Sequence, residues 1–93
     1  MIRRRVIVSG DVQGVFFRDS CRREAARWGV TGWVRNLPDR TVEAAFEGEP
    51  SSVDALVAWA HHGPSRAIVD RVTVVEEDPQ GGSGFEIRPT PLD

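Results

Sequence analysis

Residues 9–19 read S-G-D-V-Q-G-V-F-F-R-D, and this segment joins a β-branched apolar run to the start of an amphipathic helix. Gly10 and Gly14 can adopt positive φ at little steric cost, so the backbone between them can curl with several N–H groups directed at one point. The helix that follows has unpaired N–H groups at its start, and the guanidinium of Arg18 adds donors that suit phosphate oxygens. The segment predicts a site for a small phosphorylated ligand, although a plain turn with a surface arginine would give the same pattern.

Three absences from the sequence narrow the chemistry of such a site. The chain contains neither G-x-x-x-x-G-K-[ST] nor G-x-G-x-x-G, which excludes two common nucleotide-binding loops. Val12 lies six residues before Arg18, where a cysteine-dependent phosphatase would carry its nucleophile, so no phosphocysteine can form there. No group of carboxylates accompanies the segment to hold a divalent cation beside a phosphate, and we therefore expect no metal.

Length and charge limit what else the chain can be. With 93 residues it is expected to form a single domain, residues 1–93, around one core. The formal charge of -2 does not favour a polyanion, so we expect no nucleic-acid partner. The lone Cys21 argues against a disulfide-based fold, and no apolar segment is long enough for a signal peptide or a membrane span. We therefore expect a cytoplasmic protein with no membrane partner.

The first predicted strand and helix flank the glycine loop. Three arginines at residues 3–5 lead into Val6-Ile7-Val8, a run typical of a central strand. Because alternate strand residues face opposite sides, we interpret the arginines as a solvated strand end rather than as one nucleic-acid-binding patch. A helix is predicted over residues 18–28, ending at Gly29. Its buried stripe would consist of Phe17, Cys21, Ala25 and Trp28.

Two strands follow this helix. They are predicted at residues 30–36 and 41–47, joined by a turn over residues 37–40. The second strand alternates apolar and acidic residues, which predicts one inward and one outward face. The inward residues would be Val42, Ala44 and Phe46, and the outward ones Glu43 and Glu47.

A second helix is predicted from a start signal at Ser51. Asp54 lies three residues later, which resembles a capping box, and Gly63 would end the helix. Its core residues would be Val53, Leu56, Val57 and Ala60. His61 and His62 lie in the last turn, but adjacent helical residues point about 100° apart. They are therefore a poor pair of metal ligands and instead suit the negative end of the helix dipole.

The end of the chain contains two more predicted strands, residues 68–77 and 85–88. We expect them to pair as a β-hairpin across the loop of residues 78–84. The alternation of valines shifts by one residue after Val69, which indicates a β-bulge near Asp70.

The element order β-α-β-β-α-β is that of an α+β ferredoxin-like sandwich, here with a short extra C-terminal strand. In this fold two helices cover one face of an antiparallel sheet. A right-handed crossover makes the first two strands parallel, so the loop after Ser9 and the residue Asn36 would share one sheet edge, roughly 10 Å apart. An amide can hold a water molecule there, although asparagine before a turn is also ordinary turn chemistry.

Two segments closely resemble the signature motifs of the acylphosphatase family. They are G-D-V-Q-G-V-F-F-R at residues 10–18 and G-W-V-R-N at residues 32–36, the second followed by Val42-Glu43. The resemblance implies that Arg18 and Asn36 are catalytic: the arginine and the loop backbone bind the phosphate, and the asparagine positions the attacking water. The phosphate-binding residues would be Gly14, Val15, Phe16, Phe17 and Arg18, and the loop would owe its shape to Gly10, Gln13 and Gly14.

The resemblance also implies a reaction. Such an enzyme would hydrolyse the carboxyl-phosphate bond of acyl phosphates by direct water attack, without a metal, a cofactor or a covalent intermediate. Inorganic phosphate would be both product and inhibitor, and nothing in the sequence argues against a monomer. The alternative is a non-catalytic anion-binding or interaction module, because one fold can serve several functions.

Two residues depart from the family's pattern. Arg40 stands where the family usually has glycine in the turn after Asn36, and a residue with a Cβ resists positive φ, so the turn could be rebuilt and Asn36 displaced. Asp11 occupies a loop position that is often basic or polar. A carboxylate about 8 Å from a dianion would cost on the order of 1 kcal/mol unless it points away.

Overall fold

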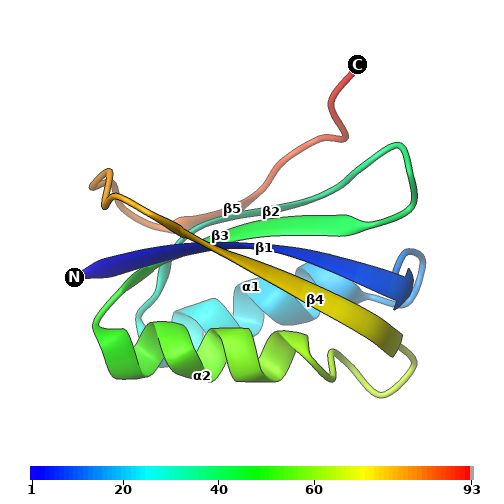
Figure 1. Ribbon diagram of the computed structural model, residues 1–93, viewed down its shortest axis with the longest axis horizontal. Helices are drawn as coiled ribbons and strands as arrows, with labels where there is room; N and C mark the ends of the chain where they lie inside the picture. Colours follow the sequence, from blue (N-terminus) through cyan, green and yellow to red (C-terminus); the bar gives the residue numbers. More distant parts are fainter. Residues whose placement is uncertain (93) are drawn as a thin grey trace.

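The computed structural model describes residues 1–92, which form five strands and two helices (Figure 1). In chain order they are β1 (Ile2–Asp11), α1 (Phe17–Trp28), β2 (Thr31–Asn36), β3 (Val42–Gly48), α2 (Pro50–Ala60), β4 (Ile68–Glu77) and β5 (Phe85–Ile87). Neither helix is long and apolar enough to cross a membrane. The order of the elements confirms the predicted α+β ferredoxin-like fold.

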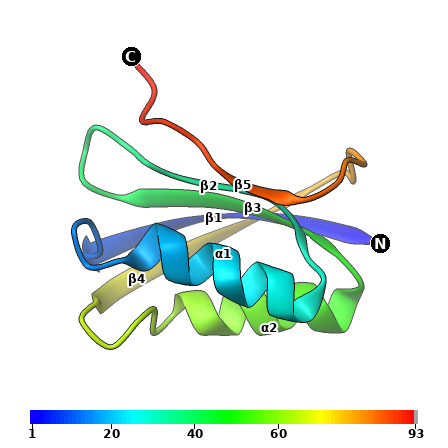
Figure 2. The same ribbon diagram turned by 180° about the vertical axis from the view of Figure 1, so that it is seen from behind.

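The five strands form one sheet in the order β4-β1-β3-β2-β5. β3 runs antiparallel to both β1 and β2, so these two strands run parallel to one another with β3 between them. Both helices lie on one face of the sheet (Figure 1 and Figure 2). Because β1 and β2 run parallel, their ends lie on the same side of the sheet. The loop after β1 therefore lies beside Asn36, as the right-handed crossover predicts.

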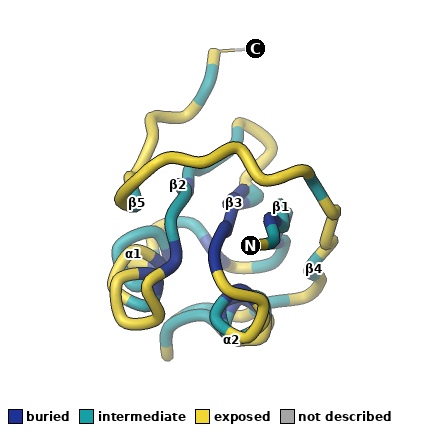
Figure 3. The backbone as a smooth tube through the Cα atoms, turned by 90° about the vertical axis from the view of Figure 1, so that its left-hand side faces the viewer, coloured by how far each residue is buried: buried dark blue, intermediate teal, exposed yellow. Residues whose placement is uncertain are grey.

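The predicted hairpin between the last two strands is wrong. β4 pairs antiparallel with β1 at one edge of the sheet, and β5 pairs parallel with β2 at the other edge, so the sheet is mixed. Figure 3 shows the connecting segment arching across from β4 to β5. Four strand spacings total about 19 Å, and seven extended residues span up to about 24 Å. The loop of residues 78–84 is therefore long enough to cross the sheet, so its length does not require β4 and β5 to form a hairpin.

The β-bulge predicted near Asp70 is present. The register between β1 and β4 shifts between Ser9 and Gly10, and Asp70 has no opposite residue in β1. Gly10 has φ +127°, and a Cβ at this position would lie 2.2 Å from the carbonyl oxygen of Ile68. Only glycine lets the two strands approach this closely at the point where the glycine loop begins.

The apolar core lies between the sheet and the helices. The predicted helix stripes point into it, except that Trp28 is 44% exposed and Val57 is half-buried. Cys21 is fully buried, and this burial, with the charge of Glu24, raises the pKa of its thiol well above the usual range, as suits a core residue. Each buried apolar side chain stabilises the fold by about 1.5–3 kcal/mol. The largest fully buried side chains are Phe46, Leu56, Val6, Val8, Val12, Val34, Val42 and Val53.

The predicted capping box at Ser51 is not formed. α2 begins at Pro50, and Glu49 at the N-cap makes no side-chain capping hydrogen bond. Proline suits the first helical position because its missing N–H would have no helical acceptor there, and its φ already fits the helix. The end of α1 at Gly29 is as predicted, since this residue adopts φ 67°.

The face of the sheet opposite the helices carries a chain of ion pairs. Arg3 and Arg5 share one side of β1 and lie against glutamates of the neighbouring strands, and Arg3 is only 6% exposed. The predicted solvated strand end is therefore wrong, because residues at positions i and i+2 of a strand do form one patch. The ion pairs connect, in this order, Glu47, Arg3, Glu77, Arg5, Glu43 and Arg35, with N–O distances from 2.7 to 3.3 Å.

Glu47, at one end of this ion-pair chain, also holds the loop between β4 and β5. Its two carboxylate oxygens accept the backbone N–H groups of Gln80 and Gly81, both at 2.8 Å, and Arg3 donates to it at 3.3 Å. These hydrogen bonds, that of Gln80 first, keep the pKa of Glu47 below its ordinary value of 4.5 despite its burial. Glu47 thus stays charged and fixes the loop that carries β5 to its edge.

Replacement of Glu47 by Gln is expected to lower the free energy of unfolding by about 3 kcal/mol at pH 7, because Arg3 loses a buried counter-charge. A carboxylate whose pKa falls on folding stabilises the fold above its unfolded pKa, and that contribution is lost as the pH drops through the folded pKa. The difference between wild type and Glu47→Gln should therefore shrink below about pH 4.5. Urea denaturation at neutral and acidic pH measures it.

The control for this prediction is Glu86→Gln. Glu86 pairs with Arg88 on the surface, and its side chain is 64% exposed, so its loss should cost less than about 1 kcal/mol. A stability difference for Glu47→Gln that stayed constant from neutral to acidic pH would contradict the role assigned to its charge.

Candidate active site

The loop between β1 and α1 reverses the direction of the chain at the end of β1. Gly14 has φ 74° and open space around its Cβ position, so the backbone angle rather than crowding favours glycine. Phe16 lies in the same left-handed region, at φ 65°, although it carries a side chain. These two residues turn the backbone from the end of β1 onto the first turn of α1.

Gln13 ties this loop to the turn between β2 and β3. Its Nε2 donates to the carbonyl oxygens of Leu37 and Thr41, at 3.0 and 2.9 Å. The loop after β1 and the end of β2 are thereby held at a set distance. The sequence predicts Gln13 as a residue that shapes the loop, and these two hydrogen bonds are the contacts through which it can do so.

The N-terminus of α1 follows directly on this loop. Phe16 is its N-cap and provides no side-chain hydrogen bond to the helix. The first helical hydrogen bond runs from the N–H of Ser20 to the carbonyl oxygen of Phe16, at 3.0 Å. The N–H groups before Ser20 in the helix therefore have no helical acceptor, and they add to the positive end of the helix dipole. This arrangement favours an anion.

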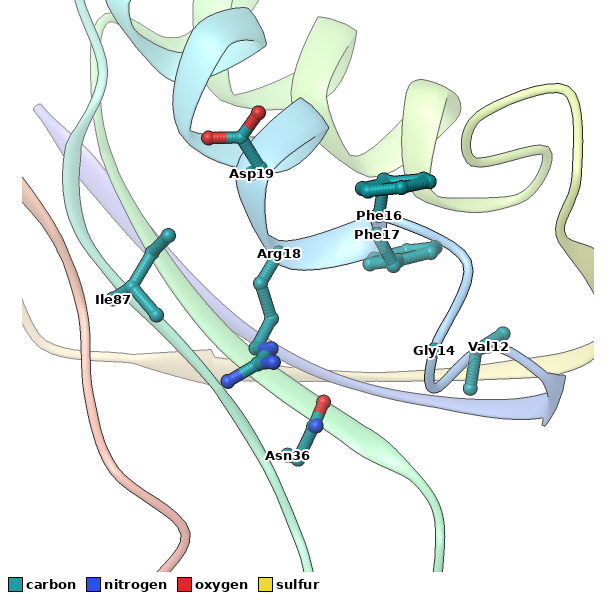
Figure 4. Close-up of a pocket in the computed structure, with 8 residues that line it drawn as sticks. All are labelled: Val12, Gly14, Phe16, Phe17, Arg18, Asp19, Asn36 and Ile87. Atoms are coloured by element: carbon teal, nitrogen blue, oxygen red, sulfur yellow. The ribbon is translucent and has the colours of Figure 1, made fainter.

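The side chain of Arg18 extends from the first turn of α1 toward the end of β2 (Figure 4). Within residues 1–92 its guanidinium forms no ion pair, in contrast to Arg3 and Arg5 on the face of the sheet opposite the helices. Asp19, its neighbour, points away and pairs with Arg22 and Arg23, at 3.1 and 2.8 Å. Arg18 therefore offers a positive charge that no ion pair within the described residues neutralises.

Asn36 ends β2 and directs its amide toward Arg18 (Figure 4). Its Oδ1 is buried and has no hydrogen-bond partner among residues 1–92. A buried acceptor without a partner costs about 1–3 kcal/mol, so such an atom marks a place where a bound molecule can supply a donor. The neighbouring Arg35 faces the other side of the sheet and pairs with Glu43, as strand alternation requires.

Arg40 in the turn after Asn36 adopts a left-handed backbone conformation. This residue adopts φ 74°, and its N–H donates to the carbonyl oxygen of Leu37 at 3.1 Å. Asp39 supports the turn by accepting the hydroxyl and the N–H of Thr41, at 2.6 and 3.1 Å, and these bonds lower the pKa of its carboxyl. Arg40 thus takes up the strained backbone angle itself, although it carries a Cβ.

Arg18 and Asn36 share a pocket of about 340 Å³. Its wall combines a cation, an amide and the start of a helix with several apolar side chains. In the described part of the chain, no three His, Cys, Asp or Glu side chains gather in a way that could hold a metal ion. The pocket is lined by Val12, Gly14, Phe16, Phe17, Arg18, Asp19, Asn36 and Ile87.

Most of the site residues proposed from the sequence meet in this pocket. Val15 belongs to the loop but does not line the pocket, and Gly10 and Gln13 lie behind it, where they connect the loop to β4 and to the turn after β2. Asp11 is exposed at the end of β1 and does not line the pocket either. The predicted residues that line the pocket are Gly14, Phe16, Phe17, Arg18 and Asn36.

Ile87 is a pocket residue that the sequence analysis misses. It lies on β5 and pairs with Val34 of β2, which brings it to the side of the pocket where β2 ends. A hairpin of β4 and β5 would have placed it at the opposite edge of the sheet. Only the parallel pairing of β5 with β2 reveals its position.

Comparisons with known proteins show the family of the chain. A family model described as Acylphosphatase matches residues 4–87. An acylphosphatase of Rubrobacter xylanophilus is 64% identical over 85 residues, covering 90% of this chain and 77% of the relative. One of Thermococcus kodakarensis is 55% identical over 86 residues, covering 92% of this chain and 94% of the relative.

The fold is shared with solved structures as well. The crystal structure of the acylphosphatase from Bacillus subtilis matches with a TM-score of 0.91 and 34% identity, covering 95% of this chain and 99% of that one. The match over residues 4–87 includes both motif segments and every strand and helix but the first residues of β1. The two motifs, the sheet order and the relatives together show that this chain belongs to the acylphosphatase family.

Proposed function

We infer that this enzyme hydrolyses the carboxyl-phosphate bond of acyl phosphates to a carboxylate and inorganic phosphate, with Arg18 and Asn36 as its catalytic residues. Family membership supports the reaction. The observation that supports the two roles is the juxtaposition, in one pocket, of an unneutralised guanidinium and a buried amide oxygen without a partner.

The phosphate of the substrate binds to Arg18 and to the loop backbone. The guanidinium offers parallel donors to two phosphate oxygens, and the free N–H groups at the start of α1 surround the third. These groups also stabilise the charge that spreads over the equatorial oxygens in the transition state. Because the loop is fixed through Gln13, this arrangement needs little rearrangement on binding.

Asn36 holds the water molecule that attacks phosphorus. Its Oδ1 accepts a hydrogen bond from the water and aligns the water oxygen opposite the carboxylate leaving group. The new bond forms between the water oxygen and phosphorus, and the bond from phosphorus to the acyl oxygen breaks, its electron pair leaving with the carboxylate. A phosphate oxygen of the substrate takes the proton from the water.

Acyl phosphates are reactive enough for positioning and charge stabilisation to suffice, so this mechanism uses no metal ion or other cofactor. The monomeric state and the cytoplasmic location expected from the sequence stay predictions, as does inhibition by phosphate. Each is open to direct measurement.

Replacement of Arg18 by Gln should lower kcat/KM for benzoyl phosphate at least about a hundredfold, or roughly 3 kcal/mol, because a charge-assisted pair is lost in both the ground and the transition state. Phosphate inhibition should weaken as well. The hydrolysis rate and circular dichroism are measured together, with Arg66→Gln, outside the pocket, as the matched control. Near-full activity in a folded Arg18→Gln protein would refute the assignment.

Replacement of Asn36 by Ala should lower kcat strongly and leave the inhibition constant of phosphate nearly unchanged, because the phosphate-binding groups around Arg18 are intact. Asn36→Asp should be at least as damaging, since it places a negative charge beside the incoming dianion. If Asn36→Ala raised the inhibition constant as much as Arg18→Gln does while kcat barely moved, Asn36 would be a phosphate ligand instead.

A chelator should leave turnover of benzoyl phosphate unchanged, because every catalytic role is assigned to a protein or substrate group. The assay compares rates before and after treatment with an excess of chelator, then after addition of magnesium. Activity that disappears with chelator and returns with magnesium would show that the mechanism depends on a metal.

A further inference from the structure

We propose that Phe16 is a specificity-determining residue that contacts the acyl group of the substrate, so that the site favours acyl phosphates with an apolar or aromatic acyl group. The proposal builds on the proposed function. It concerns the half of the substrate that Arg18, Asn36 and the loop N–H groups do not bind.

The backbone of Phe16 is strained, and the side chain of this residue does not stabilise the fold in compensation. Its φ of 65° lies in the left-handed region, which costs a residue with a Cβ on the order of 1 kcal/mol and costs glycine almost nothing. Its side chain makes no capping hydrogen bond to α1. It is 64% exposed, so the apolar core does not account for it either. Glycine would suit this position better on grounds of stability alone.

The exposed ring of Phe16 borders the reaction pocket. Phe17, the next residue, is buried and packs on Trp59, with ring centroids 5.0 Å apart, whereas Phe16 keeps most of its surface free while lining the pocket. Figure 4 shows it on the side of the pocket formed by the glycine loop, across Arg18 from Ile87. An exposed phenyl ring beside bound phosphate is available to cover an apolar group attached to that phosphate.

The direction of attack favours Phe16 over Ile87 as the acyl contact. In an in-line displacement the leaving group departs on the side of phosphorus opposite the attacking water. Asn36, which holds the water, ends β2, and Ile87 lies on the adjacent strand β5. The carboxylate therefore leaves away from β2, toward the loop on which Phe16 lies.

The test compares benzoyl phosphate with acetyl phosphate in wild type and in Phe16→Gly, Phe16→Asn and Phe16→Leu. Phe16→Gly should raise KM for benzoyl phosphate about tenfold, which corresponds to about 1.4 kcal/mol, and KM for acetyl phosphate less than about twofold. The change should appear in KM because the acyl contact is present before and during the reaction. Asparagine tolerates positive φ but is polar, so it should behave like glycine, whereas leucine should retain most of the preference.

Arg40→Gly is the matched control. Arg40 is the other non-glycine residue with positive φ within residues 1–92, and it does not line the pocket. Both glycine variants should gain stability toward urea, but only Phe16→Gly should change the ratio of the two KM values. The inhibition constant of inorganic phosphate, which has no acyl group, should change less than KM for benzoyl phosphate in the Phe16 variants, because each of them keeps the backbone N–H at this position.

An unchanged ratio of KM values in an active Phe16→Gly protein would overturn this proposal and leave the proposed function intact. An inhibition constant of phosphate that rises as much as KM for benzoyl phosphate would also overturn it, because Phe16 would then shape the phosphate loop. A change in the ratio of the two KM values in Ile87→Ala but not in Phe16→Gly would also overturn the proposal, because the acyl group would then lie on the side of Ile87. Wild-type protein that hydrolyses neither substrate would overturn the proposed function itself.

Discussion

β3 forms backbone hydrogen bonds along both of its sides and runs antiparallel to β1 and to β2. Every residue of this strand is buried. Because β3 lies between the parallel strands β1 and β2, the ends of these two strands are held at a fixed spacing on the same side of the sheet. The pocket depends on that spacing, because one end carries the anion-binding loop and the other carries Asn36.

The two faces of the sheet are stabilised by different forces. On one face, apolar side chains of the strands and of both helices form one core, and burial of apolar surface dominates. On the other, arginines and glutamates alternate in a chain of ion pairs that contributes to stability only while each charge has its partner. Glu47 joins this chain to the β4–β5 loop, so the ionic face positions β5 and with it Ile87 at the pocket.

Strained backbone is concentrated near the pocket. Phe16 and Arg40 are the non-glycine residues with positive φ in the described chain; Phe16 lies in the loop after β1, and Arg40 lies in the turn after Asn36. The angle of Arg40 is maintained by the hydrogen bonds of a tight turn. The side chain of Phe16 neither caps α1 nor packs into the core, which is why it calls for a functional explanation.

Local patterns in the sequence determined the order of strands and helices, the apolar stripes and the two motifs that identify the family. Alternation in β3, the glycine that ends α1 and the shifted valines before the bulge each depend on interactions within a few residues. Because the crossover from β1 to β2 has a strongly preferred hand, the meeting of Arg18 and Asn36 could also be inferred from element order. The start of α2 could have been found as well, since Pro50 is a local signal.

Tertiary structure alone decided where β5 pairs, what the N-terminal arginines contact and which side chains complete the pocket. A loop of seven residues can either turn back on its own strand or cross the sheet, and the outcome depends on the distant carboxylate of Glu47. Likewise, Arg3 is buried only because Glu47 and Glu77, far away in sequence, lie beside it. These contacts join residues more than 30 positions apart, and no pattern of neighbouring residues encodes their pairing.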